Sequence, residues 1–123
     1  MSGSFAKSLA YVLEALQNET PISQGYNYYV ISPYPNDALA YGHATCTSSL
    51  INSDCATCAN YAKSYLITAC DRGIGAQIEL VDCSMRYEQY SFVGKKTTIL
   101  ILDWNYKVVN SLSQTLCRGK SLP

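Results

Sequence analysis

The sequence is poor in the features that define several classes of protein. It has one histidine and one tryptophan, only 15% of its residues are charged, and its nine basic residues are balanced by nine acidic ones without a dense block of either sign. Proteins that bind nucleic acids need clustered Lys and Arg to neutralise phosphates, and membrane-lytic helices need a cationic face. No apolar run approaches the roughly 18 residues that cross a bilayer. We therefore expect neither a nucleic-acid partner nor membrane insertion.

Catalytic and metal-binding motifs are equally scarce. His43 is the single histidine, and its surroundings, Tyr41-Gly42-His43-Ala44, resemble no nucleophile elbow. Glu79, Asp82 and Glu88 lie on neighbouring predicted strands, but no two of them form an obvious glycosidase pair. There is no phosphate-binding glycine loop and no paired zinc knuckle. We predict a protein that is not an enzyme and that needs no metal or cofactor.

Cysteine and tyrosine, in contrast, are abundant. The chain has six cysteines and 11 tyrosines among 123 residues. An even cysteine count in a chain of this size indicates three disulfides and an oxidising compartment, although the count leaves the pairing open. Cys55-Ala56-Thr57-Cys58, at the start of a predicted helix, is alternatively a redox motif. The tyrosines suit either contact with a sugar or partner, or packing within a sheet.

Evidence for secretion in the first residues is mixed. Met1-Ser2-Gly3-Ser4 is not a charged-then-apolar signal peptide, so either a signal was replaced by a start Met or the protein is made in the cytosol. The sequon at Asn18 is compatible with glycosylation of a secreted protein. Alternatively, Asn18 only ends a helix before Pro21.

Hydrophobic periodicity predicts an α+β fold. A first helix begins at Ser4 and a second at Ser53, and small residues and cysteines form the buried stripe of the second helix, which must lie close to a flat surface. The first helix presents one apolar face, formed by Phe5, Leu9, Val12, Leu13 and Leu16. The predicted strands cover 26–31, 39–46, 74–81, 85–93, 97–103 and 106–112, with a turn at 94–96. We expect one domain over 1–123, with two helices on one face of a roughly five-stranded antiparallel sheet.

The cysteine spacing resembles a known plant family. The pattern Cys46-x8-Cys55-x2-Cys58, with Cys70 and Cys83 downstream, is similar to the ginkbilobin-like cysteine-rich domain of secreted plant proteins. The resemblance covers about residues 2–92. Further matching segments are Ala40-Tyr41-Gly42-His43-Ala44-Thr45-Cys46, Ser53-Asp54-Cys55-Ala56-Thr57-Cys58, Ile74-Gly75-Ala76-Gln77, Leu80-Val81-Asp82-Cys83 and Arg86-Tyr87-Glu88-Gln89-Tyr90-Ser91-Phe92.

The chain departs from this family at its two ends. Family members have a strand and a first cysteine before the first helix, whereas here Cys117 lies in a tail over residues 97–123. The tail supplies Cys117-x5-Pro123 and residues 2–5 supply Ser-Gly-Ser-Phe, which restores the family order if the tail is joined to the head. The resemblance therefore predicts a circular permutant, or a frame cut across two tandem repeats. The alternative is an unrelated hairpin that leaves Cys117 free or paired between chains.

The resemblance implies a disulfide map. By analogy with the family, the pairs are Cys46–Cys55, Cys58–Cys83 and Cys70–Cys117. We expect a monomer, or a domain-swapped dimer in which the last pair forms between two chains.

The resemblance also implies a secreted, mannose-binding lectin with antifungal activity in plant defence. Three polar residues form the sugar site of the family, and their positions correspond to Gln77, Glu88 and Arg118. Gln77 replaces an arginine and Arg118 replaces an asparagine, so we expect weak or undetectable mannose binding. The alternative function is a non-catalytic extracellular protein-interaction module, as in the cysteine-rich receptor-like kinases that carry the same domain.

Overall fold

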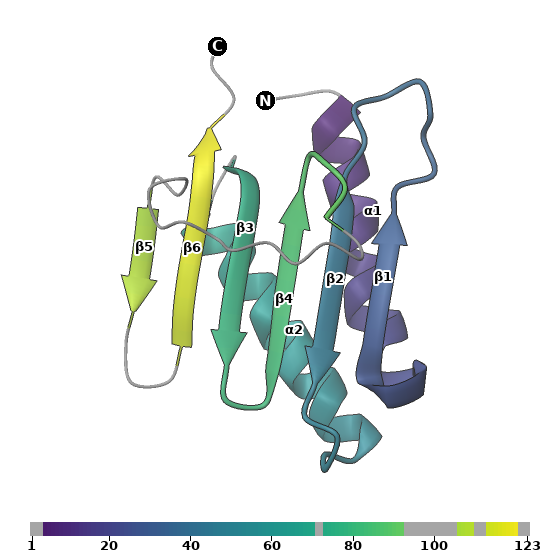
Figure 1. The fold of residues 1–123 in the computed structure, drawn as a ribbon, viewed down its shortest axis with the longest axis vertical. Coiled ribbons are helices and arrows are strands. Elements are labelled where there is room, and N and C mark those ends of the chain that lie inside the picture. The colour runs from purple at the N-terminus through teal and green to yellow at the C-terminus, as the bar shows by residue number, and fades with distance from the viewer. Residues whose placement is uncertain (1–3, 71–72, 93–105, 110–112, 121–123) are drawn as a thin grey trace.

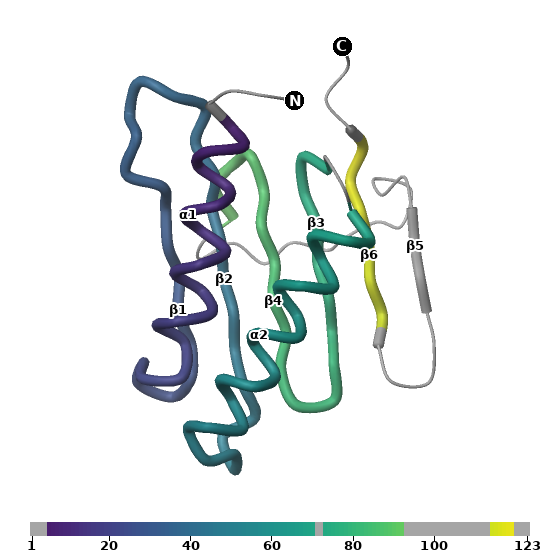
Figure 2. Tube along the Cα trace, turned by 180° about the vertical axis from the view of Figure 1, so that it is seen from behind, coloured from purple at the N-terminus to yellow at the C-terminus, as the bar shows by residue number. Residues whose placement is uncertain are grey.

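A computed structural model of the chain describes residues 4–70, 73–92, 106–109 and 113–120. The elements are α1 (Ser4–Glu19), two short 3-10 turns η1 (Thr20–Ile22) and η2 (Gln24–Tyr26), β1 (Asn27–Ile31), β2 (Tyr41–Cys46), α2 (Asn52–Ala69), β3 (Gly73–Leu80), β4 (Cys83–Glu88), β5 (Tyr106–Val109) and β6 (Ser113–Lys120). The strands form one antiparallel sheet in the order β1-β2-β4-β3-β6-β5 (Figure 1). Both helices lie on the same face of this sheet, as the view from behind shows (Figure 2). The predicted fold class is confirmed, with six strands in place of roughly five.

Helix α1 packs through the apolar face that its periodicity predicts. Phe5, Val12, Leu13 and Leu16 are buried, and Leu9 is partly buried against the same core. The helix lies so close to β2 that a β-carbon on Gly42 would collide with the Val12 side chain. Glycine at this position therefore permits the close contact between helix and strand.

Helix α2 lies flat on the central strands, as its stripe of small residues predicts. Cys55, Ala59, Ala62 and Leu66 are buried beneath it. Small side chains let a helix backbone approach a sheet closely, and the larger buried side chains Ile78 of β3 and Met85 of β4 fill the core on the sheet side.

Three disulfides attach the elements to one another. They join Cys46 to Cys55, Cys58 to Cys83 and Cys70 to Cys117, which are the pairs that the family resemblance implies. The first links β2 to the start of α2, and the other two link α2 to β4 and to β6. The covalent links therefore hold α2 at both of its ends.

One strand prediction needs correction, and a second is described only in part. The strand predicted over 85–93 ends at Glu88, because the chain turns there and Phe92 comes back to stack on Arg86. Of the strand predicted over 106–112, the structure describes β5 (Tyr106–Val109), and residues 110–112 lie outside the described residues. Cys117 lies inside a separate strand, β6. That strand pairs with β3 along its length, as expected for the cysteine-bearing tail.

Some predictions lie outside the described residues. They concern the strand over 97–103, the turn at 94–96 and the approach of the tail to residue 2. Within the part of the chain that the structure describes, no helix has the length and apolar character needed to cross a membrane.

Candidate functional site

The open face of the sheet, opposite the two helices, carries the three residues of the predicted sugar site. Strand register places Glu88 of β4 beside Gly75 of β3, and Gly75 beside Arg118 of β6. In the next cross-strand row, Gln77 of β3 pairs with Arg86 of β4. Because side chains alternate between the two faces of a strand, these residues share the open face.

Glu88 is the centre of a buried ion-pair cluster. Its side chain is 0% exposed. Oε1 accepts a hydrogen bond from Nε of Arg118 at 3.1 Å, and Oε2 accepts from Nε and Nη2 of Arg86 at 3.0 and 2.9 Å. A carboxylate this deeply buried must be paired to remain charged, and the two guanidinium groups supply that pairing. Both carboxylate oxygens are therefore already engaged within the protein.

Gly75 makes room for this carboxylate. A β-carbon on Gly75 would collide with Oε1 of Glu88, because the Glu88 side chain extends across the glycine toward β6. Gly75 was not among the residues predicted to form the site, although a glycine in the interior of a strand is a recognised sign of close approach by another group.

Two aromatic side chains complete the cluster. Neither of them, nor Arg86, was among the residues predicted to form the site. The hydroxyl of Tyr90 lies 3.2 Å from Nη2 of Arg86 and 3.3 Å from Nη2 of Arg118. The ring of Phe92 stacks on Arg86, with Cζ 4.2 Å from the ring centroid. Guanidinium groups bind aromatic faces in this way through cation–π attraction. The only hint in the sequence was that Arg86, Tyr90 and Phe92 share one short segment with Glu88.

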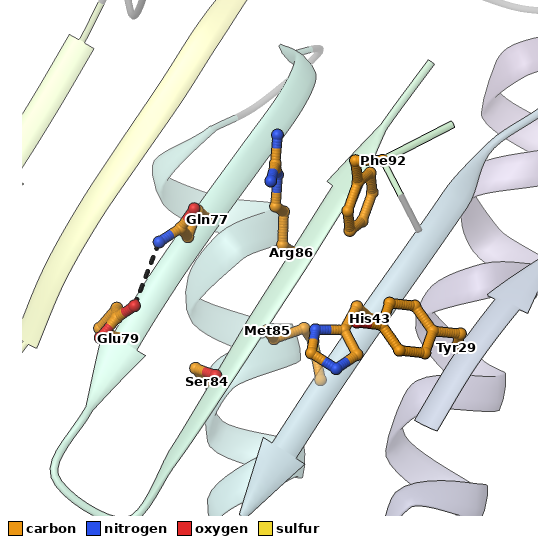
Figure 3. A pocket seen from close by; sticks show the side chains of 8 residues that line it. All are labelled: Tyr29, His43, Gln77, Glu79, Ser84, Met85, Arg86 and Phe92. Atoms are coloured by element: carbon orange, nitrogen blue, oxygen red, sulfur yellow. Dashed lines mark hydrogen bonds between the residues drawn. The ribbon is translucent and has the colours of Figure 1, made fainter. Parts of the chain in front are cut away.

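Gln77 is not drawn into the cluster. Its side-chain Nε2 donates to Oε1 of Glu79 at 3.2 Å, along its own strand (Figure 3). The structure therefore brings Glu88 and Arg118 together and places Gln77 one row away on the same face.

His43 is a strand residue on β2. Its ring stacks on Tyr29 with centroids 3.9 Å apart, and Nε2 lies 2.5 Å from Oδ1 of Asn27. Burial, and to a lesser degree the neighbouring Arg86, lower the pKa of His43 below its ordinary value of 6.5. The lowered pKa favours the neutral imidazole, and Nε2 donates its hydrogen to Oδ1 of Asn27, because an amide oxygen can only accept.

The other residues singled out from the sequence lie apart from this face. Asn18 is exposed in the last turn of α1, where it remains a predicted glycosylation site, and Thr20 of its sequon is buried. Among the described residues, no group of three His, Cys, Asp or Glu side chains is arranged to hold a metal ion.

Comparison with known proteins identifies the family of this chain. The family model described as salt stress response/antifungal matches residues 1–90. The chain belongs to this family. Two relatives in the salt stress response/antifungal family are antifungal proteins: ginkbilobin-2 of Ginkgo biloba is 40% identical over 93 residues (74% of this chain, 69% of the relative), and a ginkbilobin-like protein of Picea abies is 37% identical over 89 residues (72% and 81%).

A solved structure supports the same fold. The tandem DUF26 ectodomain of the Arabidopsis thaliana receptor-like protein PDLP8 matches with a TM-score of 0.72 at 22% identity. The match covers 89% of this chain and 50% of that ectodomain, so the chain spans half of the ectodomain's length. At this level of identity the likeness concerns the fold alone.

Proposed function

We propose that the chain acts outside the cell as a non-catalytic binding module in plant defence. Family membership and the antifungal relatives in Ginkgo biloba and Picea abies support this role. Three disulfides suit an oxidising, extracellular environment. A fungal growth assay with the purified, oxidised chain tests the defence role, and a chain reduced and alkylated at its cysteines is the control.

The proposed ligand is a mannose-type glycan, bound at the open face by Gln77, Glu88 and Arg118. The observation that carries this proposal is the 3.1 Å ion pair between Glu88 and Arg118, which brings two of the three residues together from distant parts of the sequence. A sugar hydroxyl would have to compete with the arginines that already engage both oxygens of Glu88. We therefore expect weak mannose binding by this chain.

A glycan array followed by calorimetric titration with mannose tests this proposal. The double variant Gln77→Arg/Arg118→Asn should bind mannose at least about tenfold more tightly than the unmodified chain, because it restores two hydrogen-bonding groups of the site. Glu14→Gln, on the exposed surface of α1, is the matched control and should change nothing. Tight mannose binding by the unmodified chain that survives Glu88→Gln would contradict this placement of the site.

A second candidate function is protein interaction, and two exposed isoleucines on adjoining segments favour it. Ile22 is 73% exposed and Ile51 is 64% exposed. They are the chain neighbours of Pro21 and Asn52. Nδ2 of Asn52 donates a hydrogen bond to the carbonyl of Pro21 at 2.6 Å, and this bond joins η1 to the start of α2. If no glycan binds the unmodified chain or the Gln77→Arg/Arg118→Asn variant, protein interaction becomes the favoured function. Ile22→Asp and Ile51→Asp should then weaken the association of the chain with a second domain of the same family in sedimentation experiments.

We also propose that residues 1–123 form a single domain in which residues 97–123 replace the N-terminal strand region of the family. The support is that β6 pairs with β3 and that Cys117 bonds to Cys70 of the same chain. A rearranged chain with 97–123 placed ahead of residue 2 should fold with the same three disulfides, as peptide mass spectrometry would show. Scrambled pairing would argue against the permutation.

A further inference from the structure

Strand β1 forms one edge of the sheet, and among the described residues it pairs with β2 alone (Figure 1). The backbone groups on its outer side are therefore available to a further strand. Soluble proteins usually protect such an edge with Lys or Pro, whereas Asn27-Tyr28-Tyr29-Val30-Ile31 has no charged residue and no proline. Tyr29 is 42% exposed and Ile31 is 51% exposed. The outer edge of β1 thus has the composition of a pairing surface.

The sequence of β1 is complementary to itself. If two copies pair antiparallel over the full strand, Tyr29 lies opposite Tyr29 of the copy, Tyr28 opposite Val30, and Asn27 opposite Ile31. Tyr28 and Val30 pack against the core, so alternation places the other three side chains on the open face. Every pair then lies on one face, and contacts of aromatic with aromatic or β-branched side chains stabilise a sheet. No like charges meet across this pair.

Helix α1 also fits beside a second copy of itself. It lies behind β1 and β2 and contacts both strands (Figure 2). Neighbouring strands are about 4.8 Å apart, so pairing of the two β1 strands places the two α1 helices about 10 Å apart, the usual separation of packed helices. Tyr11 and Ala15 of α1 and Tyr28 of β1 line a hollow of about 500 Å³, which leaves room for side chains of the second helix.

The charges of α1 match those of an antiparallel copy. Lys7 lies near its start with its side chain 59% exposed, and Glu19 is its last residue and is exposed. Lys7, Tyr11, Ala15 and Glu19 follow one another at intervals of four residues, which is the spacing of one ridge on a helix. In an antiparallel pair of helices, Lys7 of each chain faces Glu19 of the other. A lysine there offsets the unfavourable position of a carboxylate at the negative end of α1, whose last turn has no basic residue of its own.

We propose that the outer edge of β1 joins two copies of this chain into a twofold symmetric dimer. In this dimer β1 pairs with β1, α1 packs beside α1, and the two sheets form one continuous sheet. The surface is separate from the glycan site proposed at Glu88 and Arg118 and from the exposed isoleucines at the start of α2. It exchanges no strand or disulfide between the chains, which distinguishes it from a domain-swapped dimer.

Sedimentation velocity of the oxidised full chain, from about 10 μM to about 1 mM, tests the proposal and should show a reversible equilibrium of monomer and dimer. Tyr29→Lys should weaken the dimer by at least about tenfold, because two lysines then face each other across the twofold axis. Tyr61→Lys, the same change at a 54% exposed position on α2, is the matched control and should dimerise like the unmodified chain.

A charge exchange tests the contact between the helices. Lys7→Glu should weaken the dimer by about tenfold, and Lys7→Glu/Glu19→Lys should restore it, because each ion pair is rebuilt with its charges reversed. The amide hydrogens of β1 should also exchange with solvent more slowly as the protein concentration rises, since pairing protects them.

The outcomes separate this surface from the alternatives, and none of them depends on sugar binding. A monomer at every concentration would overturn the proposal. A dimer that Tyr29→Lys leaves intact would also overturn it, because association would then use another face, such as the one at Ile22 and Ile51. A dimer that persists in non-reducing denaturing electrophoresis is joined by exchanged disulfides and would exclude edge pairing. Failure of the double variant to regain the dimer would overturn the α1 contact.

Discussion

Gly75 and Glu88 are neighbours in the sheet, and the carboxylate of Glu88 occupies the space that a side chain on Gly75 would need. The absence of a β-carbon lets the carboxylate reach across β3 and pair with Arg118 on β6. One glycine thus allows a buried ion pair to join three adjacent strands.

Gly75→Ala should destabilise the fold by about 2 kcal/mol, because the added methyl group collides with a buried carboxylate that Arg86 and Arg118 hold in place. Urea unfolding of the oxidised chain measures this cost. The same substitution in a Glu88→Ala background should cost clearly less, because the collision with the carboxylate is gone and only the contact with Cβ of Arg118 at 3.3 Å remains. Equal costs in both backgrounds would show that the two residues do not compete for space.

Glu88→Gln should lower the free energy of unfolding by about 3 kcal/mol, because it leaves the guanidinium groups of Arg86 and Arg118 together without their anion. Chemical denaturation followed by circular dichroism provides the measurement. Glu14→Gln, an identical change at an exposed position, should have an effect near zero. A loss no larger than that of the control would mean that the ion pairs do not stabilise the fold.

The Cys70–Cys117 disulfide should be the covalent link that keeps β6 beside β3. It joins residues 47 positions apart, so replacing both cysteines by alanine should cost about 4 kcal/mol by the loop-entropy relation. Denaturation midpoints measure the loss, and non-reducing peptide mass spectrometry of the parent chain should recover this link together with Cys46–Cys55 and Cys58–Cys83. A Cys55–Cys58 link would contradict the structure.

His43 should make the fold less stable in mild acid. Burial, with a smaller effect of Arg86, lowers the pKa of His43 in the folded chain below 6.5, so the unfolded chain binds its proton more readily. The stability that neutral His43 contributes is present above pH 6.5 and is lost as the pH falls through the lower, folded-state pKa.

Urea midpoints of the parent chain and of His43→Gln, compared at about pH 7.5 and about pH 5, test this expectation. Glutamine keeps a side-chain donor for Asn27 but does not titrate, so the variant should lose less stability in acid. An identical pH dependence in the two proteins would exclude His43 as the source.

The local elements of the fold could be predicted from the sequence alone. Apolar residues in α1 recur at helical spacing, and the small residues and cysteines of α2 recur in the same way. Residues on consecutive turns of one helix therefore form each buried face. The grouping of strands after the second helix indicated the α+β class, and the spacing of cysteines indicated the family. These features depend on residues that are close together in the chain.

Strand register brings the residues of the candidate site together, and no local sequence pattern determines that register. Glu88 and Arg118 are 30 residues apart, and they meet only because β3 lies between their strands with a glycine at the shared row. Phe92 belongs to a segment with the composition of a strand, yet it turns back because stacking on the Arg86 guanidinium replaces further pairing along β4. The sequence by itself determined which faces of the helices would be buried, because periodicity is a property of neighbouring residues. Only the tertiary structure determined which polar side chains meet on the open face, because pairing between strands brings together residues that are distant in the chain.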